Sequence, residues 1–325
     1  MKKQYLIVNV KIFQIGREMK NTKKFIIIIS ILLIILVSGC IEPMINLQNL
    51  QITEQKKEET SDILSIESIE TIPKPPIFTG DSFVFYFIIK NNDNIKQIKN
   101  IKVIMFDPSV FKGSLEPERC SEYYPCSLLP LDQKVISFNL TAPTKEEIGN
   151  IEINPRISFR VIYTLEGSTT YDVIGINLDE LAKYQQAGKS ISLTRNKIIT
   201  SGPIKIDAEL INAEAVISGK SGRLRFIIRN LGTGSLLNNA IGKNDLRIDF
   251  SGLEVTNEME ELFSCSSSVC TNKEEIRLIG KESPPLLFTI KMPSNIEIWK
   301  TFTINAKVNY TYDTRGYKDI SVIPA

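Results

Sequence analysis

Apolar and polar residues alternate in several stretches of this chain. From residue 301 to residue 312, every even-numbered residue is apolar or aromatic apart from a small alanine, and every odd-numbered residue is polar. Residues 157–165 repeat this pattern with Ile162 as the exception, and residues 223–229 follow it around Leu224, Phe226 and Ile228. A period of two residues is typical of a strand with one buried face and one wet face. The pattern therefore predicts antiparallel sheets, with no sign of parallel βαβ units.

One short helix is predicted between the strand-rich parts of the chain. Asn177 can cap its first turn, Glu180 completes a capping box three residues later, and Gly188 can end it. Leu178 and Leu181 would share its apolar face.

The strand-rich sequence occurs twice. Phe87-Ile88-Ile89-Lys90-Asn91 returns 139 residues later as Phe226-Ile227-Ile228-Arg229-Asn230, and Thr79-Gly80-Asp81-Ser82 returns at the same offset as Ser218-Gly219-Lys220-Ser221. Further on, Val161-Ile162-Tyr163-Thr164 is answered by Val308-Asn309-Tyr310-Thr311. A shared offset of this kind indicates two copies of one unit.

These patterns predict an all-β protein with two tandem immunoglobulin-like antiparallel β-sandwiches joined by a short helix, each near the ~100 residues usual for such a sandwich. The expected organisation is a signal segment at 1–40, a polar tether at 41–62, sandwich domains at 63–176 and 203–325, and a helix with linker at 177–202.

The N-terminal segment indicates export. Lys23 and Lys24 precede the apolar run 25–37, and Ser38-Gly39-Cys40 follows it. A cationic start, a short apolar run and small residues before a cysteine are typical of a cleavable signal with a lipobox, which would make Cys40 a lipidated first residue. Translation is expected to start at Met19. The alternative is an uncleaved anchor helix over 25–41, at the short end of membrane-spanning length.

Five cysteines are odd in number for an exported protein, and assigning Cys40 to lipid leaves four. Cys120 and Cys126 stand close together in one polar loop, and Cys265 and Cys270 stand in another. Exported proteins retain disulfides, so two local disulfides are predicted. A zinc site would have to bring together pairs from different domains, and redox pairs prefer a two-residue gap. No metal site is therefore expected.

The chain contains no histidine, which excludes a Ser-His-Asp triad, a Cys-His pair and histidine-bound metals. No glycine-rich phosphate loop follows a strand, and the net charge of +2 is interspersed, so neither nucleotide nor nucleic-acid binding is expected. Carboxylate-only chemistry of the glycosidase type stays formally open, although the acidic residues are spread along loops. We expect no cofactor and no enzymatic activity.

Three aromatic residues and two asparagines are candidates for contacts at the surface. Tyr123 and Tyr124 lie between Cys120 and Cys126, and Trp299 is the only tryptophan. Exposed aromatic residues are natural contact hot spots. Asn139-Leu140-Thr141 and Asn309-Tyr310-Thr311 are N-glycosylation sequons on predicted strands.

The repeated motif extends from Gly-Asp/Lys-Ser through an alternating strand to Lys/Arg-Asn-x-Asp/Gly, and a second strand follows at 100–106 or 245–250. In these residues the chain resembles the immunoglobulin-like modules of archaeal and bacterial surface proteins, of the cell-adhesion-related CARDB and S-layer-associated type. The resemblance implies a spacer or adhesion role. The cysteine-bearing insertion after the second strand departs from the family pattern, so no binding site there can be carried over. The Ile- and Lys-rich composition suits a methanogenic archaeon.

The sequence thus predicts a cell-surface lipoprotein held by membrane lipid through Cys40 or by the 25–41 helix, with its body on the extracellular face. We expect it to act as a non-catalytic binding, adhesion or scaffolding module for an envelope partner such as the S-layer, a pilus or a membrane complex. The alternatives are a solute-binding lipoprotein of a transporter and a single-pass accessory protein of a pilus or archaellum.

Overall fold

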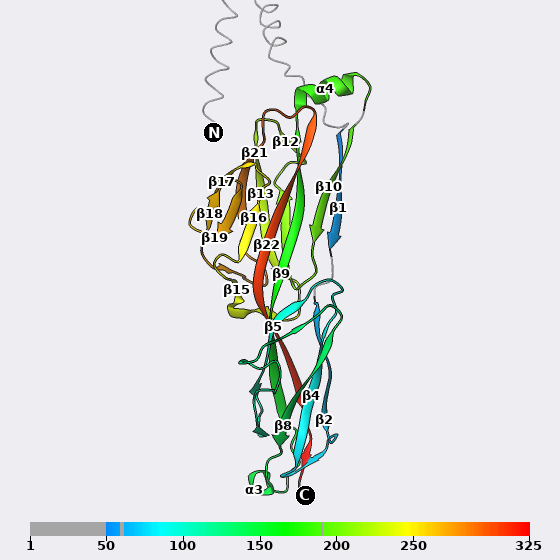
Figure 1. The fold of residues 1–325 in the computed structure, drawn as a ribbon, viewed down its shortest axis with the longest axis vertical. Coiled ribbons are helices and arrows are strands. Elements are labelled where there is room, and N and C mark those ends of the chain that lie inside the picture. Colours follow the sequence, from blue (N-terminus) through cyan, green and yellow to red (C-terminus); the bar gives the residue numbers. More distant parts are fainter. Residues whose placement is uncertain (1–49, 59–61, 190) are drawn as a thin grey trace, which may run out of the picture. The chain divides into compact units, whose positions relative to one another are not determined.

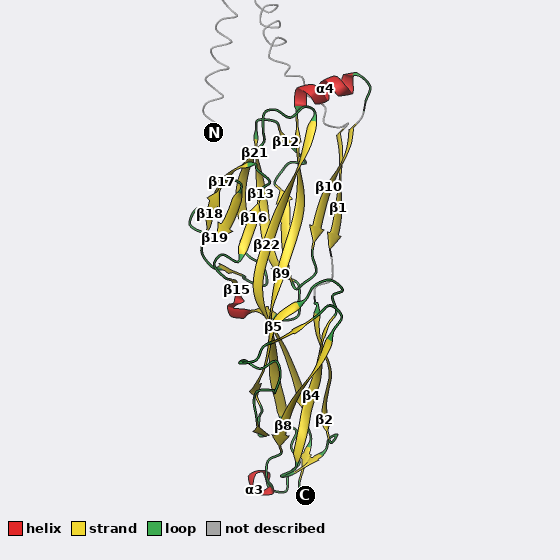
Figure 2. Cartoon of the chain, viewed as in Figure 1, coloured by secondary structure: helices red, strands yellow, loops and turns green. Residues whose placement is uncertain are grey.

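The fold is built mostly from β-strands (Figure 2). The structure, a computed structural model, describes residues 50–58, 62–189 and 191–325. The predicted signal segment, Met19, Cys40 and the alternative anchor helix at 25–41 lie outside the described residues. Within the ranges described, no helix is long and apolar enough to cross a membrane.

Two four-stranded antiparallel sheets have equivalent strand orders, one in each half of the repeat. The first contains β2 (Leu64–Ile72), β4 (Ser82–Asn91), β8 (Gln133–Thr141) and β6 (Lys112–Gly113). The second contains β11 (Ile204–Leu210), β13 (Ser221–Asn230), β21 (Leu286–Lys291) and β17 (Glu254–Asn257). Because β4 and β13 start 139 residues apart, the repeated sequence forms repeated elements.

A large sheet packs against both small sheets. Its main path is β1 (Leu50–Glu58), β10 (Ile191–Ile199), β9 (Arg156–Ile176), β22 (Trp299–Asp319), β16 (Leu246–Asp249), β19 (Val269–Asn272) and β18 (Phe263–Ser266). The strands β5 (Ile98–Asp107), β7 (Cys126–Leu128), β12 (Val216–Ile217) and β14 (Ser235–Leu236) join it at the sides. Phe87 of β4 stacks on Phe159 of β9 with ring centroids 3.9 Å apart, which places aromatic rings between the layers.

The remaining elements are short. Two small ladders join β15 (Ala240–Ile241) to β20 (Ile276–Arg277) and β3 (Ile77–Phe78) to β23 (Val322–Ile323). The helices in the described ranges are α3 (Lys145–Ile148), α4 (Leu178–Gln186) and a 3₁₀ turn at Leu237–Asn239.

The alternating patterns mark the buried faces of the strands. In β22 all six apolar positions from Phe302 to Tyr312 are buried, and the intervening positions up to Thr311 are exposed or half-buried. In β9 the positions from Ile157 to Leu165 behave in the same way. The mostly β fold with packed sheets is therefore confirmed. The expectation of purely antiparallel sheets is wrong for the large sheet, in which β1 lies parallel to β10 and β12 parallel to β9. The two tandem immunoglobulin-like domains at 63–176 and 203–325 stay a prediction.

The two longest strands connect the two halves of the repeat. β9 and β22 pair antiparallel over 21 residues each, from Trp299 opposite Ile176 to Asp319 opposite Arg156 (Figure 1). The first part of β9 also pairs with β5, and the last part pairs with β10 and β12. Both strands lie in the large sheet, and β9 therefore runs from the part of that sheet beside β5 to the part beside β10 and β12.

Part of the predicted tether is a strand. β1 lies parallel to β10 from Leu50 opposite Ile191 to Glu58 opposite Ile199, so neither 50–58 nor 191–199 is free linker. Ile52 packs with Leu193 in a small hydrophobic cluster, and Glu54 forms an ion pair with Arg195 at 3.1 Å. The sequence did not predict this strand, because β1 is polar and its one apolar contact and one ion pair leave no regular alternation of apolar and polar residues. The other tether residues, 41–49 and 59–61, lie outside the described residues.

The predicted helix is present as α4. The side chain of Asn177 accepts hydrogen bonds from the backbone N–H groups of Asp179 (3.2 Å) and Glu180 (3.4 Å), as its capping role requires. Leu181 is buried against Ile174 and Ile176 of β9. The helix thus covers the end of the large sheet where β9 stops.

Candidate binding sites

The first cysteine ring is fixed to the large sheet. The sulfur atoms of Cys120 and Cys126 are 1.95 Å apart, at disulfide-bonding distance as predicted. Cys120 is buried, and its carbonyl oxygen accepts a hydrogen bond from the N–H of Val103 in β5 (2.7 Å). Within the ring, the hydroxyl of buried Ser121 accepts a hydrogen bond from the N–H of Tyr124 (3.1 Å). These contacts hold the ring in one conformation.

Tyr123 and Tyr124 project from this ring. They are 80% and 75% exposed, the two most exposed tyrosines among the described residues. Both line a pocket of about 410 Å³ together with residues 137–139 of β8. Glu116 and Glu118 complete its rim. Two exposed aromatic side chains on a disulfide-closed backbone ring, beside carboxylates, form a surface suited to contact with another protein.

The second cysteine pair lies on strands and not in a loop. Cys265 of β18 pairs directly with Cys270 of β19, and their sulfur atoms are 1.96 Å apart. The expectation of a polar loop is wrong here, because the serines around the pair obscure the strand pattern in the sequence. The four residues within the ring are three serines and a valine. This ring therefore has no counterpart to Tyr123 and Tyr124.

Both sequon asparagines occupy exposed faces of strands. Asn139 of β8 lines the same pocket as Tyr123 and Tyr124, so two features predicted separately lie together. Asn309 of β22 lies in a different groove, described next. An exposed amide is a requirement for glycan attachment, and both residues meet it.

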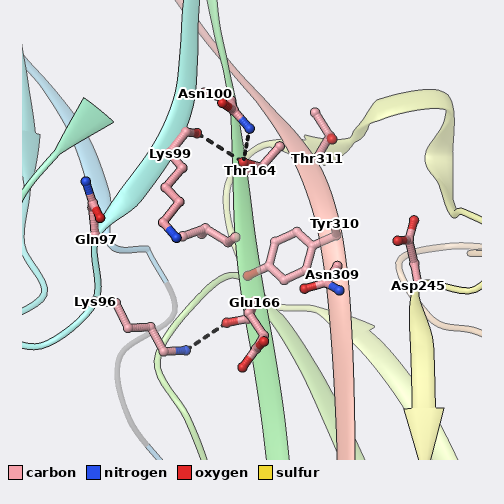
Figure 3. Close-up of a pocket in the computed structure, with 11 residues that line it drawn as sticks. Lys96, Gln97, Lys99, Asn100, Thr164, Glu166, Asp245, Asn309, Tyr310 and Thr311 are labelled. Carbon is pink, nitrogen blue, oxygen red and sulfur yellow. Dashed lines mark hydrogen bonds between the residues drawn. The ribbon is translucent and has the colours of Figure 1, made fainter. Parts of the chain in front are cut away.

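A polar groove of about 580 Å³ lies over the middle of the β9–β22 ladder (Figure 3). Its floor includes Thr164 and Glu166 of β9, which pair with Thr311 and Asn309 of β22. The residues around Lys99 line one side and Asp245 the other, so each half of the repeat supplies one wall.

Hydrogen bonds and burial define the groove's electrostatics. The ammonium of Lys96 donates to the carbonyl oxygens of Glu166 (2.9 Å) and Ser201 (2.7 Å), which ties its loop to β9. Burial raises the pKa of the Asp245 carboxyl group. The carboxylate of Glu166 lies 3.9 Å from the ammonium of Lys307. With both signs of charge and several amides, the groove can hold a polar ligand, but no charge dominates it.

The sequence did not identify this groove. Its lining comes from β9, from β22, from the start of β5 with the loop before it, and from the loop before β16, four segments far apart in the chain. One feature of the sequence pointed to the groove. Asn100 lies near the start of β5 and Asp245 directly precedes β16, so both stand at the beginning of the second strand of their repeats. Among the described residues, no cluster of three or more potential metal-binding side chains occurs.

Trp299 lies far from the tyrosine pocket. It is the first residue of β22, where it pairs with Ile176 at the α4 end of the ladder, and its side chain is 48% exposed. The structure thus separates the predicted aromatic contacts into two places: Tyr123 with Tyr124 and Asn139, and Trp299 beside α4.

Comparison with known proteins identifies no family for this chain. No family model matches it, and no curated protein matches it. Several solved structures align at low similarity, including the following three. The C-terminal globular domain of an oligosaccharyltransferase from Pyrococcus abyssi has a TM-score of 0.22 at 10% identity, and the alignment covers 78% of this chain and 46% of that structure. The YadV chaperone has a TM-score of 0.18 at 9% identity, with 80% of this chain and 100% of the chaperone covered. Domains 4–9 of the surface layer protein SbsC have a TM-score of 0.18 at 11% identity, with 82% and 32% covered. These similarities are too low to indicate a function for this chain.

Proposed function

We propose that this protein is a membrane-anchored, non-catalytic surface protein that binds another protein of the cell envelope through its Tyr123–Tyr124 ring. The observation that carries this proposal is the pair of highly exposed tyrosines held in a ring closed by Cys120 and Cys126. Because the disulfide and the backbone hydrogen bonds already restrain the backbone of the ring, binding through these tyrosines orders little additional backbone, which favours them as contact residues.

The anchor part of the proposal rests on the sequence. The lipobox Ser38-Gly39-Cys40 supports lipidation of Cys40, with the 25–41 helix as the alternative anchor. Two cysteine pairs at bonding distance support an oxidising location outside the cytoplasm. The partner would be an S-layer, pilus or membrane-complex protein of an archaeal envelope, in keeping with the resemblance to surface modules.

A scaffolding contribution is supported by the β9–β22 ladder. Twenty-one paired residues cross from one half of the repeat to the other, so the two halves are joined by a continuous ribbon and not by a flexible linker alone. A ribbon of this kind holds the tyrosine ring at a fixed position relative to the rest of the body.

Solute binding is less well supported. Such lipoproteins normally place their ligand between two α/β lobes. In the part of the chain that the structure describes, α3, α4 and the 3₁₀ turn are the only helical elements, and they do not flank parallel sheets. The groove over β9 and β22 is the feature on which this alternative depends.

We also propose that Asn139 and Asn309 are N-glycosylated. A glycan on Asn139 would border the tyrosine pocket and limit which partners can approach it. Intact mass before and after removal of Asn139 or Asn309 by mutation to glutamine tests this directly.

The proposed function is tested with the full-length protein purified from its own membranes. Three forms are compared for co-purifying envelope proteins: wild type, Tyr123→Ala/Tyr124→Ala, and Tyr317→Ala. Tyr317 is a matched control because it is also an exposed tyrosine, at 59%, and lies near the C-terminal end of β22, outside the cysteine ring. We expect the same envelope protein with wild type and Tyr317→Ala, and its loss from the double variant while the circular dichroism spectrum stays unchanged. Equal recovery in all three forms would reject the tyrosine ring as the binding site.

A further inference from the structure

The end of the large sheet beside α4 carries a row of three apolar residues. Ile176, the last residue of β9, pairs with Trp299 of β22 on one side and with Ile217 of β12 on the other. Cross-strand partners project from the same face of a sheet. Ile176 is buried in the cluster that contains Leu181 of α4, whereas Trp299 is 48% exposed and Ile217 is 38% exposed. The helix therefore covers the centre of the row and leaves both ends open.

Charged residues around this row are balanced in sign. Lys183 of α4 pairs with Glu180 at 2.7 Å, and the ammonium of Lys300 lies 5.2 Å from the centre of the Phe302 ring. Glu297 lies exposed next to Ile298, close to Trp299. Because neither sign dominates, attraction to an oppositely charged partner does not explain the exposed apolar side chains.

The chain segment that leads to the predicted anchor enters at this same end. β1 begins at Leu50 opposite Ile191, and Ile52 belongs to the cluster that contains Leu181 and Ile176. Nine residues lie between Cys40 and Leu50, so ten Cα-to-Cα steps connect them. A chain of that length reaches about 35 Å when fully extended and roughly 17 Å on average when flexible. An anchor at Cys40 therefore keeps the α4 end of the body within reach of the lipid headgroups.

We propose that Trp299 and Ile217 contact the lipid surface, so that the body stands on the membrane with its α4 end. This inference rests on the proposed anchoring through Cys40. Tryptophan favours the interface between headgroups and hydrocarbon because its ring is apolar and its N–H is polar. Ile217 adds a second apolar contact across the covered centre of the row. Since the surrounding charges balance, the contact depends on apolar insertion and not on anionic lipid.

The chain offers a direct probe, because Trp299 is its only tryptophan. The full-length protein purified from membranes is placed in phosphatidylcholine vesicles with or without bromine-labelled lipid, which quenches nearby indole fluorescence. We expect labelled lipid to reduce Trp299 emission at least twofold, with little change when salt is raised. In the control variant Trp299→Phe/Tyr317→Trp, the indole is moved 18 residues along β22, roughly 60 Å away. Its emission should not change.

Failure of this inference is distinguishable from failure of the anchor. Protein that co-sediments with vesicles but shows equal quenching at positions 299 and 317, or none at either, would overturn the contact while leaving the anchor intact. Protein that does not co-sediment would contradict the anchor; its Cys40 thiol is then coupled to maleimide-headgroup lipid, and the same quenching comparison decides the contact. Ile217→Asp gives a second variant, for which we expect weaker Trp299 quenching with an unchanged circular dichroism spectrum.

Discussion

Thr164 pairs with Thr311, its own counterpart in the sequence repeat, at the middle of the β9–β22 ladder. Residues of β9 before Thr164 pair with residues of β22 after Thr311, and the converse holds on the other side. The two halves of the repeat therefore meet around a local two-fold relationship. Each half completes its large-sheet layer with a strand from the other.

The shared ladder predicts that the second half of the repeat is unstable alone. A fragment of residues 203–325 lacks Tyr171, Val173 and Ile176 of β9, all buried in the full chain. It also leaves the edge of β22 unpaired. We expect no cooperative thermal transition for 203–325, whereas a fragment of 166–325 should regain one. A 203–325 fragment that melts cooperatively at the temperature of the full chain would show that the halves are independent domains.

The repeated Lys/Arg-Asn motif has a structural role in both halves. The side-chain N–H₂ group of buried Asn91 donates to the carbonyl oxygens of Lys96 (2.7 Å) and Leu129 (3.0 Å), and its oxygen accepts from the N–H of Asp93 (3.0 Å). Removing this amide leaves buried backbone groups unpaired, at about 1–3 kcal/mol for such groups. Asn91→Ala should lower the free energy of unfolding by roughly that amount in urea denaturation. Asn92→Ala, at the exposed neighbouring position, should change it little.

The last residue of the same motif differs between the halves, and the structure explains why. Gly232 stands where the first half has Asp93. A Cβ atom at Gly232 would lie 2.5 Å from the Tyr312 hydroxyl and 2.6 Å from a carboxylate oxygen of Asp62. Overpacking of this kind typically costs about 1–3 kcal/mol. Gly232→Ala should therefore lower the melting temperature, and Gly232→Asp should lower it further by adding a charge beside Asp62. A variant as stable as wild type would show that the residues around Gly232 can move to accommodate the added side chain without loss of stability.

Asp207 makes stability depend on pH. Its burial raises the pKa of the carboxyl group, but the hydrogen bond and charge of Lys197 and the charge of Arg229 lower it more, so the net shift is downward. The pKa of this carboxyl group is about 3.9 in the unfolded chain and lower in the folded protein. The ionised group therefore stabilises the folded protein at pH values above about 3.9, and this stabilisation is lost as the pH falls through the pKa of the folded state. Asp207→Asn should be less stable than wild type at pH 7, and the difference should shrink towards pH 3. Urea titrations at both pH values test this, and a constant difference would contradict it.

The sequence predicted the strands whose two faces differ and missed those whose faces do not. Residues 301–312 alternate because one face is wet, and the structure confirms them. Residues 171–176 of β9 are buried on both faces, so no alternation shows that the strand continues into the other half. The polar strand β1 gave no signal because Ile52 is its main apolar contact.

The candidate sites were predictable only as separate residues. The proximity of Cys120 and Cys126 in sequence was enough to predict their pairing, and the position of Tyr123 and Tyr124 between them indicated exposure. Their meeting with Asn139 depends on how β8 packs beside the ring, which no local pattern encodes. The groove around Thr164 and Thr311 depends likewise on the long-range register of β9 and β22.

Cross-linking in living cells tests the central claim most directly. A photo-reactive residue is placed at position 123, with position 317 as the matched control, and covalently attached proteins are identified by mass spectrometry. We predict reproducible capture of one envelope protein, such as an S-layer or filament subunit, from position 123 and not from position 317. Capture of a transporter permease would favour solute binding, and absence of any reproducible partner at position 123 would contradict a binding role for the tyrosine ring.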